Sequence, residues 1–423
     1  MGGSHSNIVA DMITADVIII GAGAAGLMTA ISASETEDKK IILLDSSPFP
    51  GKKILMSGGG RCNITNADLN FKNYFGESPN AVKKVILQFP PEKVIDFFHQ
   101  HQVKTKIEKP WNKYFPVSDD AKTVLNALLS IVRQQNIHQH FDEKVISFNP
   151  DDNGHWQIET HKNRYKTKQI VLAFGGFSYP HTGSDGSLWK NLTRLEIPLI
   201  EPHPALTPLK TSDKITHELS GLTHWCGFTV FRDNDRIFTE NNSLLFTHDG
   251  LSGPGILDIS QWFTHQKPNH EFKLEISFLS EKNDEELSAI ITTEALKNPS
   301  LQIEKFLQHN LPNRLSVMLT SLSDCSGKSL NQLTKKDRQN LIRNILHFTP
   351  TISGHFGYKK AEVTAGGIPF SEIDLKTMQL KRFPGLFAVG EVVNVHGIVG
   401  GYNFQWAWSS GWVCGKSLKQ PVV

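Results

Sequence analysis

The stretch Asp16-Val-Ile-Ile-Ile-Gly-Ala-Gly-Ala-Ala-Gly-Leu-Met-Thr-Ala30 predicts a buried strand, a glycine-rich turn and a helix of small residues. Gly21 permits the tight turn, Gly23 lets the backbone approach a pyrophosphate, and Gly26 lets the helix pack close to the strand. Glycine-rich turns are common, so this spacing alone is a weak signal. Its context decides whether it binds a dinucleotide.

The residues after the turn support a dinucleotide site. Phosphates would lie on the free N–H groups at the start of the helix, at Ala24 and Ala25. A second strand, Lys40-Ile-Ile-Leu-Leu44, ends in Asp45 and Ser46, where an acid for a ribose hydroxyl is expected. We therefore predict a β-α-β dinucleotide-binding unit. A tight strand–helix turn without a ligand is the alternative.

Residues 46–66 lack regular periodicity and predict a loop that presses its backbone against a ligand. The loop contains Ser57-Gly-Gly-Gly-Arg-Cys-Asn63, and an arginine next to glycines suits a phosphate. A flexible surface loop is the alternative, but the apolar run Ile54-Leu-Met56 argues against it. The loop residues predicted to bind the cofactor are Lys52, Lys53, Gly60, Arg61, Cys62 and Asn63.

The next part of the chain predicts two helical regions and a small β-meander. Apolar spacing near three and four covers residues 80–102 and 119–135. Short alternating segments predict antiparallel strands near 143–149, 155–160 and 164–168. The run Gln169-Ile-Val-Leu-Ala-Phe-Gly-Gly176 then predicts a buried strand that ends on a glycine pair. Its end is a second place for the cofactor, and the predicted positions are Val145, Ala173, Gly175 and Gly176.

The composition changes between about residues 190 and 355. Residues 205–282 are rich in β-branched and aromatic residues with turn signals, whereas residues 284–347 show helical periodicity. We therefore predict a β-rich insert domain at 191–283 and a helical subdomain at 284–354.

The end of the chain returns to the first pattern. The run Gly385-Leu-Phe-Ala-Val-Gly-Glu391 predicts a strand that ends in a glycine and an acid, which suits a ribitol or ribose hydroxyl. Gly400-Gly-Tyr-Asn403 opens an apolar helix to about Ser417, and its start can stabilise negative charge. The predicted cofactor positions here are Gly390, Glu391, Gly400, Gly401, Tyr402 and Asn403. The cofactor domain is thus discontinuous, at 14–190 and 355–423.

Composition excludes several classes of protein. The chain has 423 residues and a net charge of +2, so it carries no strong electrostatic signal for nucleic acid or membrane. Its four scattered cysteines form no CxxC pair, which excludes a common dithiol flavoenzyme and a zinc knuckle. We predict no metal site and no membrane span, and we expect a cytoplasmic protein because the cysteines fit a reducing compartment.

The combination of motifs resembles one flavoprotein family. A single GxGxxG with a C-terminal strand ending Gly390-Glu391 resembles the glutathione-reductase-type FAD-binding superfamily. The motifs Ser57-Gly-Gly-Gly-Arg-Cys-Asn63, Phe246-Thr-His-Asp-Gly250, Thr364-Ala-Gly-Gly367 and Gly400-Gly-Tyr-Asn-Phe-Gln-Trp406 are similar to the BaiN/YhiN-type FAD-dependent oxidoreductases, also described as aminoacetone oxidase-like flavoproteins. The resemblance runs through the chain from about residue 14.

This resemblance implies an α/β fold. It has a discontinuous Rossmann-like FAD-binding domain of three layers (ββα), a β-barrel-like insert and a helical subdomain. The cofactor is one non-covalent FAD, with NAD(P)H as a transient reductant because no second GxGxxG has a strand and helix around it. The family usually has an acid shortly after the Gly-Glu pair, but here Val393-Asn394 stands there, which removes that acid from consideration.

Three functions remain open. The first is an NAD(P)H-using reductase of an activated C=C bond, in an enone or a uracil-type ring such as a uridine of ribosomal RNA. The second is an amine or aminoketone oxidase that uses oxygen, and the third is a non-catalytic flavin-binding sensor. The sequence assigns no catalytic residue. Cys62 and His248 are candidates, each outweighed by a structural role, and His181 and His396 rank below them.

Overall fold

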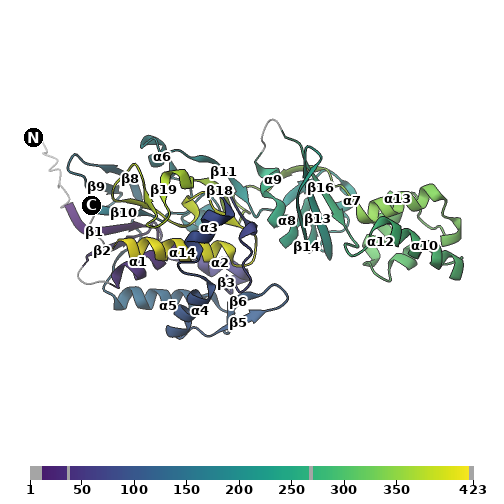
Figure 1. Ribbon diagram of the computed structural model, residues 1–423, viewed down its shortest axis with the longest axis horizontal. Coiled ribbons are helices and arrows are strands. Elements are labelled where there is room, and N and C mark those ends of the chain that lie inside the picture. The colour runs from purple at the N-terminus through teal and green to yellow at the C-terminus, as the bar shows by residue number, and fades with distance from the viewer. Residues whose placement is uncertain (1–11, 36–38, 266–269, 419–423) are drawn as a thin grey trace, which may run out of the picture. The chain divides into compact units, whose positions relative to one another are not determined.

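The computed structural model describes residues 12–35, 39–265 and 270–418, which fall into two compact units. The first unit joins the N-terminal part of the chain, up to Pro204, to the C-terminal part that begins at Glu362 (Figure 1). The second unit is the insert from Ala205 to Ala361. Each unit has its own hydrophobic core.

The first unit is built on a parallel sheet in the order β7-β2-β1-β10-β21. Its central strands are runs of buried aliphatic residues, as expected for a sheet covered on both faces. The elements before the insert are β1 (Met12–Ile20), α1 (Ala24–Ser34), β2 (Ile41–Leu44), α2 (Lys52–Gly60), β3 (Thr65–Asn66), η1 (Phe71–Asn73), β4 (Tyr74–Phe75), α3 (Pro79–Ile86), α4 (Pro91–Gln100), β5 (Thr105–Glu108), β6 (Lys113–Pro116), α5 (Ala121–Gln134), β7 (His138–His140), β8 (Val145–Pro150), β9 (Trp156–Thr160), β10 (Arg164–Leu172), η2 (Pro180–Thr182), α6 (Trp189–Arg194) and β11 (Ile200–Ala205). Those after it are β18 (Val363–Gly367), η4 (Phe370–Glu372), β19 (Ile373–Asp374), β20 (Gln379–Leu380), β21 (Leu386–Ala388), η5 (Gly390–Val392), β22 (His396–Gly397) and α14 (Tyr402–Ser417).

The register brings the ends of four strands to one edge of the sheet. Ile20 of β1 pairs with both Leu44 of β2 and Leu172 of β10. Leu172 in turn pairs with Ala388 of β21. The turns that follow these strands therefore start side by side, at the carboxyl edge where open α/β sheets bind ligands.

Helices α1 and α14 pack against each other in the first unit (Figure 1). A Cβ added to Gly411 of α14 would lie 2.5 Å from the carbonyl oxygen of Ala25. A Cβ added to Gly415 would lie 2.6 Å from the carbonyl oxygen of Thr29. The glycines of α14 thus let this helix pack closely on α1, the helix of the dinucleotide motif.

Several predicted elements have other limits in the structure. The helical region 80–102 is two helices, α3 and α4, because Pro90 and Pro91 interrupt it. The predicted strands 164–168 and 169–172 form one strand, β10. The predicted loop 46–66 contains the helix α2, which begins at Lys52 after the left-handed Gly51. The antiparallel meander is confirmed as β8, β9 and the first half of β10.

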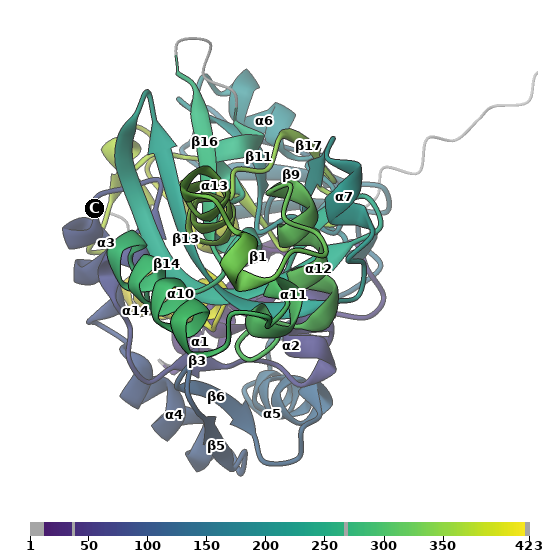
Figure 2. The same cartoon turned by 90° about the vertical axis from the view of Figure 1, so that its right-hand side faces the viewer.

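The second unit combines a six-stranded sheet, in the order β16-β13-β14-β15-β12-β17, with a group of helices. Figure 1 shows α10, α12 and α13 gathered at one end of these strands, and in Figure 2 the same helices face the viewer. The resemblance implies a barrel, in which the two end strands of the sheet, β16 and β17, would pair. Among the described residues, one isolated bridge, Ile276–Phe348, joins β16 to the segment before β17. The elements are β12 (Leu209–Thr211), α7 (Lys214–His217), β13 (Thr223–Arg232), β14 (Asp235–Thr247), β15 (Gly250–Ser252), α8 (Pro254–Ile259), α9 (Gln261–Thr264), β16 (Phe272–Ser277), α10 (Asp284–Lys297), α11 (Ile303–Leu307), α12 (Asn313–Leu322), η3 (Leu330–Gln332), α13 (Lys335–Leu346) and β17 (Ile352–His355).

The boundaries of the insert differ from the predicted ones, which follow residue 190 and precede residue 355. In the structure the insert runs from Ala205 to Ala361. Residues 191–204 stay with the first unit because Leu192 and Ile197 belong to its core and because β11 pairs with β18. The strands and helices of the insert share one core, so the helical subdomain belongs to the same unit as the strands. Within the described ranges, no helix is both long enough and apolar enough to cross a membrane.

Candidate functional site

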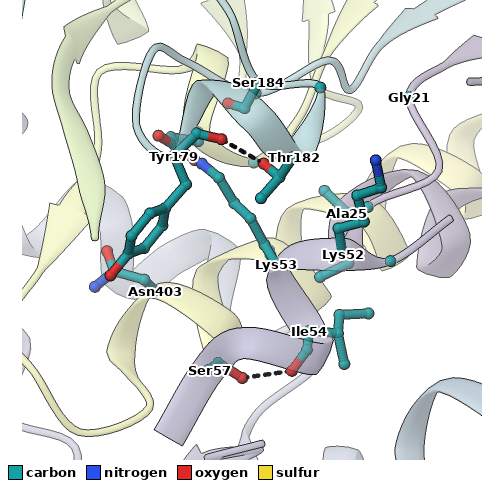
Figure 3. Close-up of a pocket in the computed structure, with 18 of the residues that line it drawn as sticks. Gly21, Ala25, Lys52, Lys53, Ile54, Ser57, Tyr179, Thr182, Ser184 and Asn403 are labelled. Atoms are coloured by element: carbon teal, nitrogen blue, oxygen red, sulfur yellow. Dashed lines mark hydrogen bonds and ion pairs between the residues drawn. The ribbon is translucent and has the colours of Figure 1, made fainter. Parts of the chain in front are cut away.

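A cavity of about 620 Å³ lies at the carboxyl edge of the parallel sheet, and we call it the main cavity. All residues that line it belong to the first unit. Figure 3 shows Lys53 extending through it between α1 and the turn of Tyr179 and Thr182. The predicted cofactor residues that line it are Gly21, Gly23, Ala24, Ala25, Asp45, Ser46, Lys52, Lys53, Arg61, Asn63, Val145, Ala173, Gly175, Gly390, Glu391, Gly400, Gly401 and Asn403.

Five predicted residues are not in its lining: Gly26, Gly60, Cys62, Gly176 and Tyr402. Gly26 has the packing role expected of it, because a Cβ there would lie 1.8 Å from the carbonyl oxygen of Gly21. Gly176 lies against Thr364 and Glu391. Tyr402 is buried behind the wall, where its hydroxyl accepts a 3.2 Å hydrogen bond from the N–H of Asn70.

The glycine turn has the geometry that a pyrophosphate needs. Gly23 is the N-cap of α1, and none of the described side chains caps this helix start. A Cβ placed on Gly23 meets no protein atom within 4 Å, so the space in front of it is open. The N–H groups at this end of α1 therefore face the cavity without a protein acceptor from a cap, and they suit an anion.

Asp45 fixes this turn and also borders the cavity. Its Oδ2 accepts a 2.7 Å hydrogen bond from the N–H of Ala22, and its Oδ1 accepts a 2.8 Å bond from the N–H of Ser47. Burial raises the pKa of Asp45, while these N–H groups and Lys52 oppose that shift. The carboxylate thus ties the end of β2 to the glycine turn beside the expected ribose position.

The segment after Gly51 forms one wall of the cavity. A single helical turn ends at Ser57, whose hydroxyl donates to the carbonyl of Ile54 at 2.8 Å (Figure 3). Gly58 and Gly59 then take left-handed backbones, with φ of 57° and 69°. A side chain at either position would be strained, so the triple glycine makes this reversal possible.

Lys53 and Glu391 form an ion pair on the cavity wall. Lys53 Nζ lies 2.6 Å from Glu391 Oε2 and donates to Ser178 Oγ at 2.8 Å. Glu391 Oε1 accepts from Ser178 Oγ at 2.7 Å and from the N–H of Thr364 at 2.9 Å. Both oxygens of the predicted ribitol ligand Glu391 therefore already have protein partners, and its charge is balanced by Lys53.

Arg61 and Asn63 also have protein partners. Arg61 Nη1 donates to Glu108 Oε1 at 2.7 Å, and the guanidinium lies 4.0 Å from the centre of the Phe115 ring. The Asn63 amide, oriented to satisfy both neighbours, donates to the carbonyl of Thr65 at 3.1 Å and accepts from the N–H of Gly401 at 3.0 Å. Both residues border the cavity, but these contacts make them supports of its wall.

The start of α14 closes another side of the cavity. Its N-cap is Gly401, with a left-handed φ of 96°, and none of the described side chains caps this end as Ser or Asp commonly does. The Asn403 amide holds the preceding loop, because it accepts from the N–H of Gly397 at 2.8 Å and donates to its carbonyl at 3.0 Å. This end of α14 thus presents ordered backbone to the cavity.

The histidine and cysteine candidates are not in the lining of the main cavity. Cys62 is fully buried in the core, and burial raises the pKa of its thiol to about 12, which makes it a structural thiol. Burial lowers the pKa of His396 to about 3, with a smaller contribution from His203, so this imidazole is neutral. His181 is exposed, and His248 is exposed in the turn between β14 and β15 of the insert.

Sequence reasoning missed several residues of the lining. Tyr179 lies in the segment after the Gly175-Gly176 pair, and Glu362 directly precedes β18. The signal that could have located both is their position beside glycine-rich turns that follow or precede buried strands. The other missed lining residues with polar or aromatic side chains include Phe49, Ser57, Lys113, Phe115, Glu143, Lys144, Thr182, Ser184, Asp185, Phe404 and Trp406.

These residues fit an FAD. The open space at Gly23 and the uncapped start of α1 suit its pyrophosphate, and Asp45 borders the ribose position. Glu391 and the start of α14 lie on the wall of the same cavity. Among the described residues no group of three or more His, Cys, Asp or Glu side chains could hold a metal ion.

Comparisons with known proteins show the family to which the chain belongs. The family model described as the HI0933-like protein Rossmann domain matches residues 15–417. The chain is 33% identical over 404 residues to a protein of Escherichia coli (strain K12) named ribosomal RNA dihydrouridine synthase, with 95% of this chain and 98% of that one covered. A protein of the same name from Haemophilus influenzae is 30% identical over 419 residues, with the same shares covered.

A third relative has another name. It is the 3-dehydro-bile acid delta(4,6)-reductase of Clostridium scindens, 29% identical over 405 residues, with 95% of this chain and 98% of that one covered. Among solved structures, the chain is similar to a 3-ketosteroid-delta4-(5alpha)-dehydrogenase from Rhodococcus jostii RHA1, at 14% identity and a TM-score of 0.47, with 98% of this chain and 99% of that one covered.

The family match spans nearly the whole chain, from residue 15 to residue 417. The chain therefore belongs to the HI0933-like Rossmann family and is an FAD-dependent oxidoreductase of the BaiN/YhiN type.

Proposed function

We propose that this protein reduces the activated C=C bond of a uracil ring in ribosomal RNA, with NAD(P)H as the electron source. The observation that carries the proposal is the main cavity. Its glycine turn suits FAD, and polar side chains such as Tyr179, Glu362 and Asn403 line other parts of its wall. Two relatives of at least 30% identity are named as synthases of dihydrouridine, the saturated form of that ring. A third relative is named as a delta(4,6)-reductase of a 3-dehydro-bile acid.

The chain's own residues divide the work in this proposal. The start of α1, from Gly23 to Ala25, holds the pyrophosphate, and Asp45 holds the adenosine ribose through the turn that it fixes. The Lys53–Glu391 pair orients the wall along the ribitol. When bound, FAD supplies hydride transfer, whose organic chemistry is its own. The residues at the start of α14 exclude water and place backbone N–H groups near developing negative charge.

The substrate test compares acceptors under anaerobic conditions. The flavin of the purified protein is reduced with NADPH or NADH, and then ribosomal RNA transcripts or a small enone are added. We expect oxidation of the flavin by RNA that contains uridine, and dihydrouridine in the digested RNA by mass spectrometry. RNA in which the uridines are already saturated is the matched control and should leave the flavin reduced.

Other outcomes support other activities. Oxidation by the enone but not by RNA would replace the RNA base with a small C=C substrate. Reduction of the flavin by an aminoketone, with no response to either nicotinamide, would favour the oxidase that the family resemblance also implies. Because ribosomal RNA and reduced nicotinamides meet in the cytoplasm, we propose that the protein works there.

A further inference from the structure

The turn after β10 holds one bulky residue in an unusual conformation. Tyr179 has a left-handed backbone, with φ of 50° and ψ of 60°, directly before Pro180. Bulky residues avoid this region, and a residue before proline is normally extended. The conformation is held because the Tyr179 carbonyl accepts 2.8 Å hydrogen bonds from both the N–H and the Oγ1 of Thr182. The turn thus fixes the direction of the phenol, and such outliers cluster at active sites.

The Tyr179 side chain points into the main cavity. Figure 3 shows its ring extending from the turn towards Asn403, with Lys53 beside it. The ring is half-buried, and within the described part of the chain no group hydrogen-bonds its hydroxyl. A phenol hydroxyl that is buried usually has a hydrogen-bond partner. Because this hydroxyl faces the main cavity, a ligand that fills the cavity and displaces water can supply that partner.

Glu362 shares the cavity wall with Tyr179. It directly precedes β18 and lines the cavity together with Lys113. Burial raises the pKa of Glu362, and the charge of Lys113 opposes that shift. Burial also raises the pKa of Tyr179, and the Glu362 carboxylate adds to the increase. The two groups thus line one cavity, and the negative charge of Glu362 disfavours the phenolate form of Tyr179.

We propose that Tyr179 is the catalytic acid of this site and that Glu362, which lines the same cavity, is a positioning residue for its hydroxyl. This inference rests on the proposed function. One carbon of the substrate C=C bond receives a hydride, whose two electrons come from the reduced nicotinamide. The π electrons then form a bond between the other carbon and the proton of Tyr179 Oη. The phenolate that remains recovers a proton from water. The C=C bond has then become a C–C single bond with two new C–H bonds, and Tyr179 is protonated again.

The first test separates the two half-reactions of the flavin-loaded protein. Tyr179→Phe removes only the hydroxyl. We expect NADPH to reduce the bound flavin as fast as in the wild type, and electron transfer to the C=C acceptor to slow by about 100-fold or more, because a positioned acid contributes about 10²–10⁴-fold. Tyr114→Phe, on β6 and outside the cavity lining, is the matched control and should keep both rates.

The second test measures the titration of Tyr179 without any turnover. The full chain is labelled with ¹³C at the tyrosine ring, and the signal that is missing in Tyr179→Phe is assigned to Tyr179. We expect its midpoint above the usual value for tyrosine, and a lower midpoint in Glu362→Gln. The other charged groups near this residue are His181, whose ring centre lies 5.9 Å away, and the Lys53–Glu391 pair bound to Ser178.

The outcomes distinguish this inference from the proposed function. A wild type that transfers electrons to a C=C acceptor, with Tyr179→Phe equally fast, overturns the catalytic acid. An unchanged Tyr179 midpoint in Glu362→Gln overturns the role of Glu362. If the wild type reduces no C=C acceptor at all, the proposed function fails, and with it the acid role, whereas the titration still decides whether the Tyr179–Glu362 pair exists.

Discussion

Gly23 and Gly26 stand three residues apart in one turn, and the structure gives them opposite surroundings. In front of Gly23 there is open space, whereas Gly26 is pressed against the carbonyl of Gly21. The first glycine leaves room for a ligand, and the second leaves room for the protein's own backbone. Their roles can therefore be separated by substitution.

Gly23→Val is expected to abolish retention of FAD while the protein stays folded. The backbone at this position is extended, with φ of −82° and ψ of −169°, and it accepts a β-branched residue, but the new side chain fills the space of the pyrophosphate. We expect FAD affinity at least about tenfold weaker, which corresponds to about 1.4 kcal/mol. The measurement is a titration of the cofactor-free protein with FAD.

Gly26→Ala is the matched control for that experiment. Its Cβ would lie 1.8 Å from the Gly21 carbonyl oxygen, so the helix must shift, and overpacking of this kind costs about 1–3 kcal/mol. We expect a lower melting temperature in this variant. A yellow Gly23→Val protein with wild-type affinity would remove the glycine turn from the cofactor site.

Acid stability gives a prediction for His396. Burial, and to a smaller extent His203, lowers the pKa of this imidazole to about 3 in the folded protein, whereas an unfolded chain protonates it near 6.5. Below about pH 6.5 the unfolded state therefore binds more protons, and stability falls as the pH drops. We expect His396→Gln to flatten the decline of unfolding free energy between pH 6.5 and pH 4 by roughly 1 kcal/mol per pH unit. Parallel declines in the two proteins would contradict the buried neutral histidine.

At the scale of the elements, an ion pair joins parts of the chain that are far apart in sequence. Lys53 belongs to α2, and Glu391 lies in η5 at the end of β21. Ser178 and the N–H of Thr364 complete the network from two further segments. The wall of the cavity is therefore held by contacts between elements. Removal of either Lys53 or Glu391 leaves the other without its ion-pair partner.

Lys53→Met is expected to lower the unfolding free energy by about 2 kcal/mol, because it leaves the Glu391 charge without its counter-ion. The two side chains are 26% and 18% exposed, which keeps the cost below that of a fully buried pair. Denaturant unfolding of Lys53→Met, Glu391→Gln and the double variant measures the coupling. We expect the double variant to lose less than the sum of the single losses, and strict additivity would show that the pair contributes nothing.

The elements also show what the sequence could and could not predict. The glycine turn, the second strand ending in Asp45 and the meander follow from local patterns, and the structure contains all three. The partner of Arg61 is Glu108, 47 positions away, and no local pattern connects them. The left-handed Tyr179 was missed for another reason, because a bulky residue before proline is normally extended. Local patterns therefore predicted the glycine turn and the strands beside it, whereas long-range contacts form the other walls of the cavity.

At the scale of the whole molecule, the two units share no core residue. One core cluster runs through the sheet and helices of the first unit, and the other joins the strands and helices of the insert. The chain enters and leaves the insert next to β11 and β18, which pair with each other in a two-stranded sheet. A short linker could therefore connect β11 to β18 in place of the insert.

Replacement of residues 205–361 by a short glycine–serine linker is expected to leave the first unit folded and able to bind FAD, because all residues of the main cavity remain. Circular dichroism and flavin absorbance of the shortened protein test this. The separate insert should fold cooperatively on its own core. A shortened protein without helical signal or flavin would show that the first unit depends on the insert.

The visible spectrum of the purified protein during anaerobic titration with NADPH and then NADH shows whether it is an FAD-dependent reductase. We expect a yellow protein, or a colourless one that takes up one FAD, and we expect its flavin absorbance to bleach promptly with one of these nicotinamides. A protein that binds no added FAD would contradict the assigned site. A flavin that neither nicotinamide reduces would contradict the reductase.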